Sequence, residues 1–439
     1  MSFRDDLKQK VLVFDGSMGR MLFENGLGAG TCPEEWNLTH PGILRKIYKG
    51  YVDAGSDIIQ TNTFQSHSIK LEEYGLKDRH YEINYQAAKL AKEVAGGKCY
   101  VAASIGPLGK LLEPFGELTF EKAYDTFKDQ IIAVADGGAD IISFETFTDI
   151  SELRIALLAA KENCSLPAIC SVSYEQNGRT LMGTEPGICA AILHSMGADL
   201  IGTNCSFGSE YMIGIAESYG KTGIPFSVKP NAGLPEIVDG KQVYKETPEG
   251  FAGFVPVFLR NGARLLGGCC GTTPQYIAEI AKLVRTSEAE NKDFTGVEPD
   301  IDYLTSASQK IAFSAIGAAG PGRIDVSTDT ALRDSLKAGD IGAVTDAAMD
   351  LLDEESDIII ADADLENSED SLLLAKVVKE AQTYLKQPFI LKSNNIKLLD
   401  AALRVYKGRA GYISNIPKAA EMFKKYGAVD CGGFLINEK

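Results

Sequence analysis

The stretch "AGSDIIQTNTF" at residues 54–64 contains the pattern that decides the fold. A glycine is followed by a small residue, a charged residue, a short apolar run and then polar or small residues. The same order occurs in "GGADIISFETF" (137–147), "MGADLIGTNCS" (196–206) and "NGARLLGGCCG" (261–271). A glycine that ends a helix and precedes a short apolar run is typical of the junction between a helix and a strand buried on both faces.

Four further apolar runs of this kind complete a set of eight. They are "VLVFDGSMG" (11–19), "YVAASIGP" (100–107), "AICSVSYE" (168–175) and "FSVKPNAG" (226–233). The intervening segments, such as 41–55 and 120–138, place apolar residues three and four positions apart, as amphipathic helices do. Eight strand and helix units predict an α/β fold, a (β/α)8 TIM barrel over residues 1–287.

Catalytic groups of such barrels lie at the C-terminal ends of the strands. The side chains expected there come from all eight units: Asp15, Thr61, Asn62, Ser104, Glu145, Thr146, Ser173, Tyr174, Asn204, Cys205, Lys229, Pro230, Asn231, Cys269 and Cys270. Three of the nine cysteines are therefore predicted at this end, and they come from the sixth and eighth strands.

Cys269 and Cys270 are adjacent, and successive side chains of a regular strand point to opposite faces. Both thiols reach one site only if the backbone turns beside them, which Gly267, Gly268 and Gly271 permit. With Cys205, three thiolates can converge, and a set of three sulfur ligands suits zinc. No C-x-x-C pair closes the tetrahedron, so we expect an open fourth position.

Other interpretations of the cysteines stay open. A single buried cysteine is usually a small apolar side chain, and this interpretation suits Cys99, Cys164, Cys170 and Cys189. A redox-active disulfide between neighbouring cysteines is a further alternative for the pair at 269–270.

Zn²⁺ held by three thiolates has a formal net charge of −1, so it activates water poorly but can hold a substrate thiol deprotonated. The sequence therefore favours alkyl transfer to a thiol.

Several motifs resemble those of the homocysteine S-methyltransferase family. They are "DGSMG", "DIIQTNTF", "IGPLG", "EPFGELTFEKAYDTF", "ETFTD", "GTNCSFG", "PNAGLPEIVDG" and "GGCCGTTPQYI", in matching order over about residues 5–287. The resemblance is greatest to the N-terminal domain of cobalamin-dependent methionine synthases. It implies that Cys205, Cys269 and Cys270 bind zinc, that homocysteine is the methyl acceptor, and that Asp15 and Glu145 bind its amino group. Ser104 and Asn204 are further candidates for substrate binding. A turn after the first strand and a helix cap are the alternative roles of Asp15 and Glu145.

Composition limits the other functions. The chain has 439 residues and a formal net charge of −16, without a Lys/Arg-rich run, so we expect no nucleic-acid partner. No apolar stretch approaches the roughly 18 residues of a membrane span, and no signal peptide is apparent, so we expect a cytoplasmic protein without a membrane partner.

Residues 309–439 follow a polar linker predicted at 288–308. Apolar runs at 311–320, 357–365, 388–395, 410–415 and 429–436 predict a smaller parallel α/β domain, too short for a full barrel. It resembles the first half of the pterin-binding domain of cobalamin-dependent methionine synthases. That family has an Asp-x-Asn where this chain has Ile360, Ala361 and Asp362, and an aspartate where it has Lys392. We therefore expect a truncated, degenerate domain that acts as a docking surface or brace and does not bind folate by itself.

The methyl donor is not apparent in the sequence. The corrinoid-binding motif Asp-x-His-x-x-Gly is absent, and its nearest match, "DRHYEI" at 78–83, lacks the glycine. We expect a separate corrinoid protein to deliver the methyl group of methylcobalamin. Two alternatives stay open: a small direct donor such as S-methylmethionine or betaine, and a non-catalytic sensor of homocysteine or zinc.

Overall fold

The computed structural model describes residues 2–234, 236–238, 241–287, 298–364 and 370–434. Contacts divide the chain into two compact units. The first comprises residues 1–182 and 198–300, and the second comprises residues 183–197 and 301–439. Residues 288–297 of the predicted linker lie outside the described residues.

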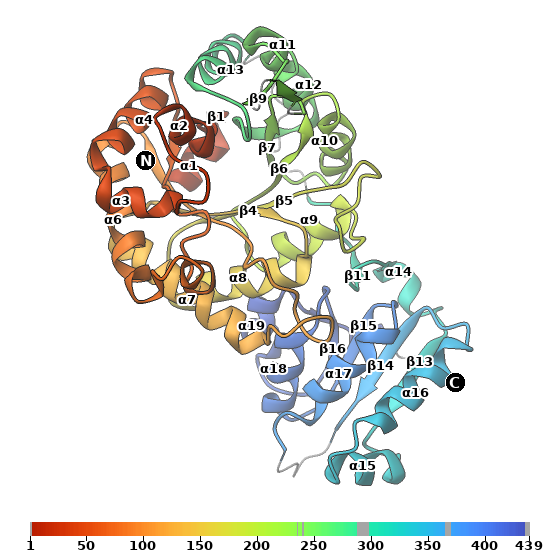
Figure 1. Cartoon of the computed structure of the whole chain (residues 1–439). Coiled ribbons are helices and arrows are strands. Elements are labelled where there is room, and N and C mark those ends of the chain that lie inside the picture. Colours follow the sequence, from red (N-terminus) through yellow and green to blue (C-terminus); the bar gives the residue numbers. More distant parts are fainter. Residues whose placement is uncertain (1, 235, 239–240, 288–297, 365–369, 435–439) are drawn as a thin grey trace. The chain divides into compact units, whose positions relative to one another are not determined.

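The first unit contains an eight-stranded parallel barrel (Figure 1). Its strands pair in the order β1-β10-β7-β6-β5-β4-β3-β2, and a bridge between Phe14 and Ile58 joins the two ends of the sheet. All eight predicted strands are confirmed: β1 Leu12–Val13, β2 Ile58–Gln60, β3 Tyr100–Ile105, β4 Ile141–Phe147, β5 Ala168–Val172, β6 Leu200–Gly208, β7 Phe226–Asn231 and β10 Ala263–Leu266.

The repeated sequence pattern has a direct structural cause. The glycines at positions 55, 138, 197 and 262 all have φ between 85° and 106°, a left-handed conformation that ends the preceding helix. In three of the four repeats the next charged residue is an aspartate. Its carboxylate accepts a hydrogen bond from the first residues of the neighbouring strand, as Asp57 Oδ2 does from Val13 N at 2.9 Å. The pattern therefore ends a helix and fixes the start of a strand against its neighbour.

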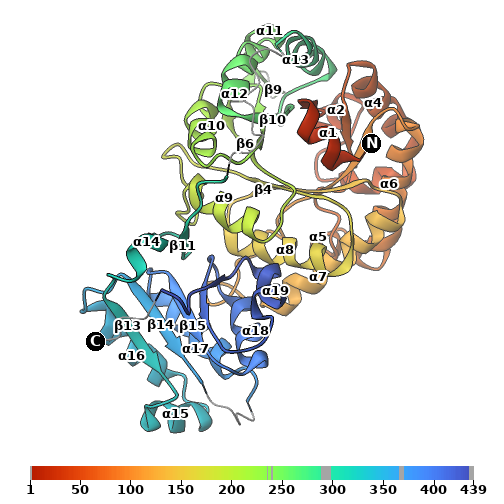
Figure 2. The same ribbon diagram turned by 180° about the vertical axis from the view of Figure 1, so that it is seen from behind.

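Helices surround this barrel (Figures 1 and 2). Those between consecutive strands are α4 Pro41–Asp53, α6 His80–Ala95, α7 Phe120–Asp136, α8 Ile150–Asn163, α9 Pro186–Ser195, α10 Met212–Lys221, α11 Pro248–Ala252 and α12 Val255–Asn261, and α13 Pro274–Thr286 follows β10. Shorter elements are α2 Met18–Glu24, η1 Pro33–Glu35, α3 Trp36–Thr39, α5 Ser68–Glu72, η2 Lys77–Arg79, β8 Glu236–Val238 and β9 Lys241–Val243.

Helix α1 (Phe3–Gln9) closes the end of the barrel at which the strands begin. Phe3 packs in one buried apolar cluster with residues near the N-terminal ends of the strands: Leu12, Phe14, Ile58, Ala102, Ile141, Ile169, Leu200 and Leu265. This end of the barrel is filled with apolar side chains, so the polar chemistry is concentrated at the C-terminal ends of the strands.

The second unit contains an open five-stranded parallel sheet in the order β13-β14-β15-β16-β17. Its strands are β13 Pro321–Asp325, β14 Ile358–Asp362, β15 Phe389–Lys392, β16 Gly411–Ile413 and β17 Val429–Asp430. The strand predicted at 311–320 is wrong. This segment forms β12 (Lys310–Ala312), which pairs antiparallel with β11 (Tyr303–Thr305), and then α14 (Phe313–Ile316). The first parallel strand starts at Pro321, beyond the apolar run, and only alternate side chains of it are buried.

The helices of this unit are α15 Thr330–Lys337, α16 Gly342–Leu352, α17 Leu373–Tyr384, α18 Ile396–Val405, α19 Ala419–Phe423 and η4 Lys424–Tyr426.

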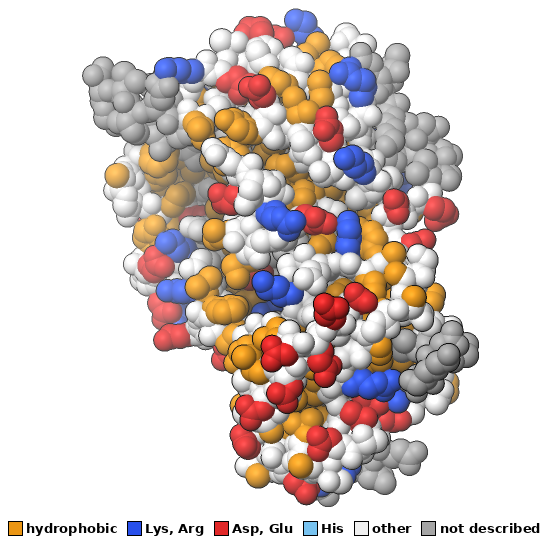
Figure 3. Space-filling model, turned by 90° about the vertical axis from the view of Figure 1, so that its right-hand side faces the viewer, with side chains coloured by type: hydrophobic (Ala, Val, Ile, Leu, Met, Phe, Trp, Pro, Cys, Tyr) orange, Lys and Arg blue, Asp and Glu red, His pale blue; other side chains and the backbone are white. Residues whose placement is uncertain are grey.

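Residues 325–357 contain ten acidic and two basic side chains, and Asp and Glu gather on the surface of this unit in Figure 3. Such a surface repels polyanions. Across the described residues, no helix is both long enough and apolar enough to cross a membrane.

Helix α9 belongs by its contacts to the second unit, although it follows β5 in chain order. The Tyr303 hydroxyl donates to Gly187 O at 3.0 Å, and Lys310 Nζ lies 3.2 Å from Glu185 Oε1. The chain therefore leaves the first unit at residue 182, returns to it at 198 and leaves it again at 300.

Candidate functional site

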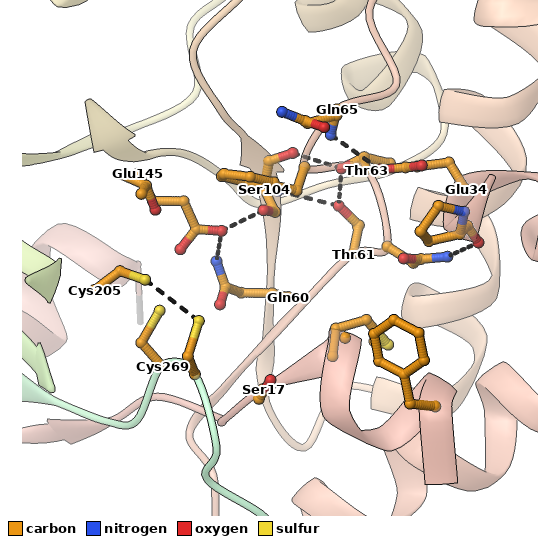
Figure 4. Close-up of a pocket in the computed structure, with 18 of the residues that line it drawn as sticks. Ser17, Glu34, Gln60, Thr61, Thr63, Gln65, Ser104, Glu145, Cys205 and Cys269 are labelled. Atoms are coloured by element: carbon orange, nitrogen blue, oxygen red, sulfur yellow. Dashed lines mark hydrogen bonds between the residues drawn. The ribbon is translucent and has the colours of Figure 1, made fainter. Parts of the chain in front are cut away.

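A cavity of about 490 Å³ lies at the C-terminal ends of the barrel strands (Figure 4). The cysteines 205, 269 and 270 line it together with Gln60, Ser104, Glu145 and Thr146. Segments after β1 and β2 line it too: Gly16, Ser17, Met18, Gly19, Phe23, Gly30, Thr31, Pro33, Glu34, Thr61, Asn62, Thr63, Phe64, Gln65, Lys70 and Tyr74. This volume is in the range typical of small-molecule binding sites.

The three predicted thiols converge in this cavity. Their sulfur atoms all lie within 4.8 Å of one another, and the sulfurs of Cys205 and Cys270 are 3.3 Å apart. Zn–S bonds of about 2.3 Å in a tetrahedral site place the sulfurs about 3.8 Å apart. This donor set would therefore fit one zinc ion.

The loop after β10 presents Cys269 and Cys270. Cys269 N donates to Pro230 O at 2.7 Å, and Cys270 N donates to the Asn231 side chain at 3.0 Å, so β7 holds both backbone groups. Any side chain at position 268 would clash with Thr272, because a Cβ there would lie 2.4 Å from its hydroxyl. Gly271 has φ 81° and completes the turn that brings both thiols to one site.

Cys205 reaches the site through an irregular end of β6. Its φ is 56°, a left-handed conformation that is rare outside glycine, and Thr146 at the end of β4 has φ 66°. The side chain of Asn204 connects these two positions. Its Oδ1 accepts from Thr146 N at 2.7 Å, and its Nδ2 donates to Thr146 Oγ1 at 2.9 Å and to Cys269 Sγ at 3.6 Å.

The proximity of the thiols determines how they ionise. The pKa of Cys205 is raised because its thiol donates to the sulfurs of Cys269 and Cys270 and is buried. The pKa of Cys270 is lowered to about 3, because the other two thiols donate hydrogen bonds to its sulfur. Neighbouring thiolates repel one another, so a bound cation would favour ionisation of all three thiols.

Glu145 lies beside the thiols, at the end of β4, and three donors hold its carboxylate. Oε1 accepts from Gln60 Nε2 at 2.7 Å and from the Ser104 hydroxyl (Figure 4). Oε2 accepts from the buried Lys229 Nζ at 2.7 Å. The buried ion pair is satisfied by hydrogen bonds, which is the condition for charges to remain in a protein interior.

Asp15 is fully buried at the end of β1 and is not among the residues that line the cavity. Its Oδ2 accepts from Gln60 N at 2.7 Å, whereas Oδ1 has no hydrogen-bond partner among the described residues. Burial raises the pKa of Asp15 to about 8, and the nearby Lys229 partly opposes this rise. An unsatisfied buried carboxylate oxygen is typical of a position completed by a ligand or a water molecule.

The structure thus gathers five of the seven predicted site residues around the cavity, and Asp15 and Asn204 lie behind it. Sequence reasoning missed two residues. Gln60 joins Asp15 to Glu145, and its position directly after the apolar run, beside the predicted Thr61 and Asn62, could have indicated it. Glu34 lines the cavity from η1, in a connecting segment that we did not associate with any strand end.

The fold and site define an α/β-barrel protein with a cluster of three thiols, able to hold a metal ion, beside a buried carboxylate. The chain belongs to the homocysteine S-methyltransferase family, since the model described as "Homocysteine S-methyltransferase" matches residues 12–284. Methionine synthase of Mycobacterium tuberculosis (strain ATCC 25618 / H37Rv) is 29% identical over 433 residues, which cover 92% of this chain and 35% of that protein. The Mycobacterium leprae (strain TN) methionine synthase is 29% identical over 464 residues, covering 97% of this chain and 38% of that protein.

The chain therefore spans little more than a third of the length of these relatives. The crystal structure of the metallated form of the homocysteine methyltransferase MmuM from Escherichia coli is similar in fold, with a TM-score of 0.54 and 22% identity. This likeness covers 63% of this chain and 96% of that one. Family membership supports a methyltransferase that acts on homocysteine.

Proposed function

We propose that this protein binds Zn²⁺ and L-homocysteine and catalyses methyl transfer to the homocysteine thiol, giving L-methionine. The convergence of Cys205, Cys269 and Cys270 on a cavity beside Glu145 is the observation that supports this most strongly. A zinc ion with three thiolate ligands favours a deprotonated, nucleophilic substrate thiol at neutral pH. The substrate sulfur attacks the methyl carbon, and the electron pair of the broken bond leaves with the donor.

The amino group of homocysteine is the counterpart of the buried carboxylates in this proposal. Glu145 faces the cavity, and Asp15 Oδ1 lacks a partner among the described residues. Lys229 occupies one acceptor position on Glu145, and Glu145 also lines the cavity, so a cationic ligand can reach this carboxylate. A zwitterionic amino acid with a thiol supplies both a sulfur for the metal and an ammonium group for the carboxylate.

We propose a methylated corrinoid carried by a partner protein as the methyl donor. The similarity to methionine synthases supports this donor, because it extends over 92% of the chain and so beyond the homocysteine-binding region. The second unit then serves as a docking surface or brace. At the ends of β14 and β15 in this unit, Lys392 Nζ lies 2.8 Å from the carboxylate of the buried Asp362. These two residues form an ion pair with each other at positions where the pterin-binding family has other residues.

Glu34 favours a second candidate, a small cationic donor such as a sulfonium compound or betaine. Its carboxylate is buried and lines the cavity, and it accepts from Gln65 N at 3.0 Å and from the Cys32 thiol at 3.4 Å. Burial raises the pKa of Glu34, and its two hydrogen-bond donors are neutral, while the charge of the nearby Lys70 only partly opposes this rise. A cationic methyl donor would neutralise this carboxylate and gain an ion pair.

A donor screen tests these proposals. Zinc-loaded protein with homocysteine is offered methylcobalamin, a methylated corrinoid protein, S-methylmethionine, betaine or methyltetrahydrofolate, and methionine is measured. The corrinoid proposal predicts turnover with the first two donors, unchanged in Glu34→Gln. The second candidate predicts turnover with a cationic donor, reduced by Glu34→Gln. Homocysteine binding without methionine from any donor would instead indicate the sensor.

A further inference from the structure

Lys229 is a charged residue in the core of the barrel. It lies on β7, its side chain is 1% exposed, and it does not line the cavity. Its ammonium nitrogen lies 2.7 Å from Glu145 Oε2 and 4.2 Å from the centre of the Phe14 ring. A lysine is rarely buried so completely unless a fixed partner needs its charge.

We propose that Lys229 is a positioning residue for substrate recognition: it holds the Glu145 carboxylate so that one acceptor position remains for the ammonium group of the amino-acid substrate. This inference rests on the proposed function, since the ligand is the substrate proposed above. Lys229 acts through Glu145 and makes no contact with the substrate itself.

The hydrogen bonds of Glu145 lead to this assignment. A carboxylate has about four lone-pair positions on its two oxygens. Oε1 accepts from both Gln60 and Ser104, and Oε2 accepts from Lys229. One position on Oε2 therefore remains. The donors come from β2, β3 and β7, three separate strands, so the carboxylate plane is fixed before the substrate binds.

The charge of Lys229 is as important as its hydrogen bond. Asp15 and Glu145 are both buried, and the Glu145 carboxylate opposes ionisation of Asp15. Lys229 therefore balances the charge of Glu145 inside the barrel, and the open position on Oε2 stays available to the ammonium group of the substrate. In Lys229→Met, the Glu145 carboxylate would be buried without a cation beside it, and Oε2 would lose the donor that holds it.

A comparison of two ligands tests this role in the full-length, zinc-loaded protein. Calorimetry gives the affinity for L-homocysteine and for 4-mercaptobutanoate, which has the same thiol and carboxylate but no amino group. The ratio of the two affinities reports recognition of the ammonium group alone. A general weakening of the fold affects both ligands alike and leaves the ratio unchanged.

We expect the wild type to prefer homocysteine by about 10- to 100-fold, the range of a charged hydrogen bond. Lys229→Met should reduce this preference to about threefold or less, with zinc content retained. Lys229→Arg should preserve most of it, because the positive charge and a donor remain. Lys161→Met is the matched control, since Lys161 is a partly buried lysine paired with Asp199 away from the cavity.

The outcomes separate the two proposals. If the wild type fails to bind homocysteine, or binds both ligands equally, the proposed recognition of homocysteine is wrong. If the wild type discriminates and Lys229→Met discriminates equally well, only the role of Lys229 is wrong. Should Lys229→Met not fold, Lys229→Gln keeps a neutral donor at this position, and an undiminished ligand preference in that variant overturns the inference.

Discussion

Asn204 and Thr146 hold each other by two hydrogen bonds between β6 and β4. The amide oxygen of Asn204 accepts from Thr146 N at 2.7 Å, and its amide nitrogen donates to Thr146 Oγ1 at 2.9 Å. Thr146 and Cys205 both have positive φ, which costs roughly 1–2 kcal/mol for a residue other than glycine. The Asn204 side chain therefore stabilises the backbone that presents one of the three thiols.

Asn204→Ala should weaken zinc binding without unfolding the protein. Loss of a residue that orients metal ligands typically lowers metal affinity by about 10- to 100-fold. Competition with a chelator of known affinity measures the change. Asn84→Ala is the control, because Asn84 is equally buried and bonded but lies in α6, away from the thiols. Equal zinc affinity in Asn204→Ala and the wild type would contradict the positioning of Cys205 by Asn204.

Each cysteine of the cluster should be needed for zinc. The purified protein should contain about one zinc ion per chain, and Cys205→Ala, Cys269→Ala and Cys270→Ala should each lose most of it together with methyl transfer. Cys170→Ala, a buried cysteine outside the cluster, should keep its metal. Metal analysis by mass spectrometry gives the stoichiometry, and full retention in the three variants would refute the site.

Asp15 should make stability fall as pH rises. Its pKa is about 8 in the folded protein, above the ordinary aspartate value of 3.8, so its stabilising contribution is complete below about pH 4 and is lost between pH 4 and 8. Asp15→Asn removes this loss, and its advantage over the wild type should grow by at most about 1.4 kcal/mol per pH unit in that range. Urea unfolding with a chelator present measures this. A constant difference, like that expected for the exposed Asp53→Asn, would contradict it.

The second unit should not bind methyltetrahydrofolate with useful affinity. Asp362 is 3% exposed as a side chain and already pairs with Lys392, so a pterin must break this ion pair before it can use the carboxylate. Each buried polar group left unsatisfied costs about 1–3 kcal/mol. Calorimetry with the intact chain should give no binding in the micromolar range, while homocysteine added to the same sample confirms that the protein is competent. Micromolar folate binding would show that this unit has kept a pterin site.

The barrel and its thiols were predictable from sequence, because both depend on local patterns. The left-handed glycines and the apolar runs encode each strand start, and adjacent cysteines among glycines are rare enough to indicate one site. The pairing of Lys229 with Glu145 was not predictable, since it joins residues 84 positions apart across the barrel. The strand predicted at 311–320 failed because apolar content alone does not distinguish a sheet strand from a hairpin strand followed by a short helix.

The path of the chain through α9 bears on how the protein is synthesised. Seven of its ten residues are buried, among them Ile188, Ile192 and Leu193, and its hydrogen-bonding and ionic partners include Tyr303 and Lys310. During translation these partners leave the ribosome more than a hundred residues after the helix. The nascent chain must therefore hold residues 183–197 without these partners until residues 301–439 emerge, and incompletely folded states of this kind are prone to aggregation. An exchange of C-terminal units between relatives would have to carry residues 183–197 with it.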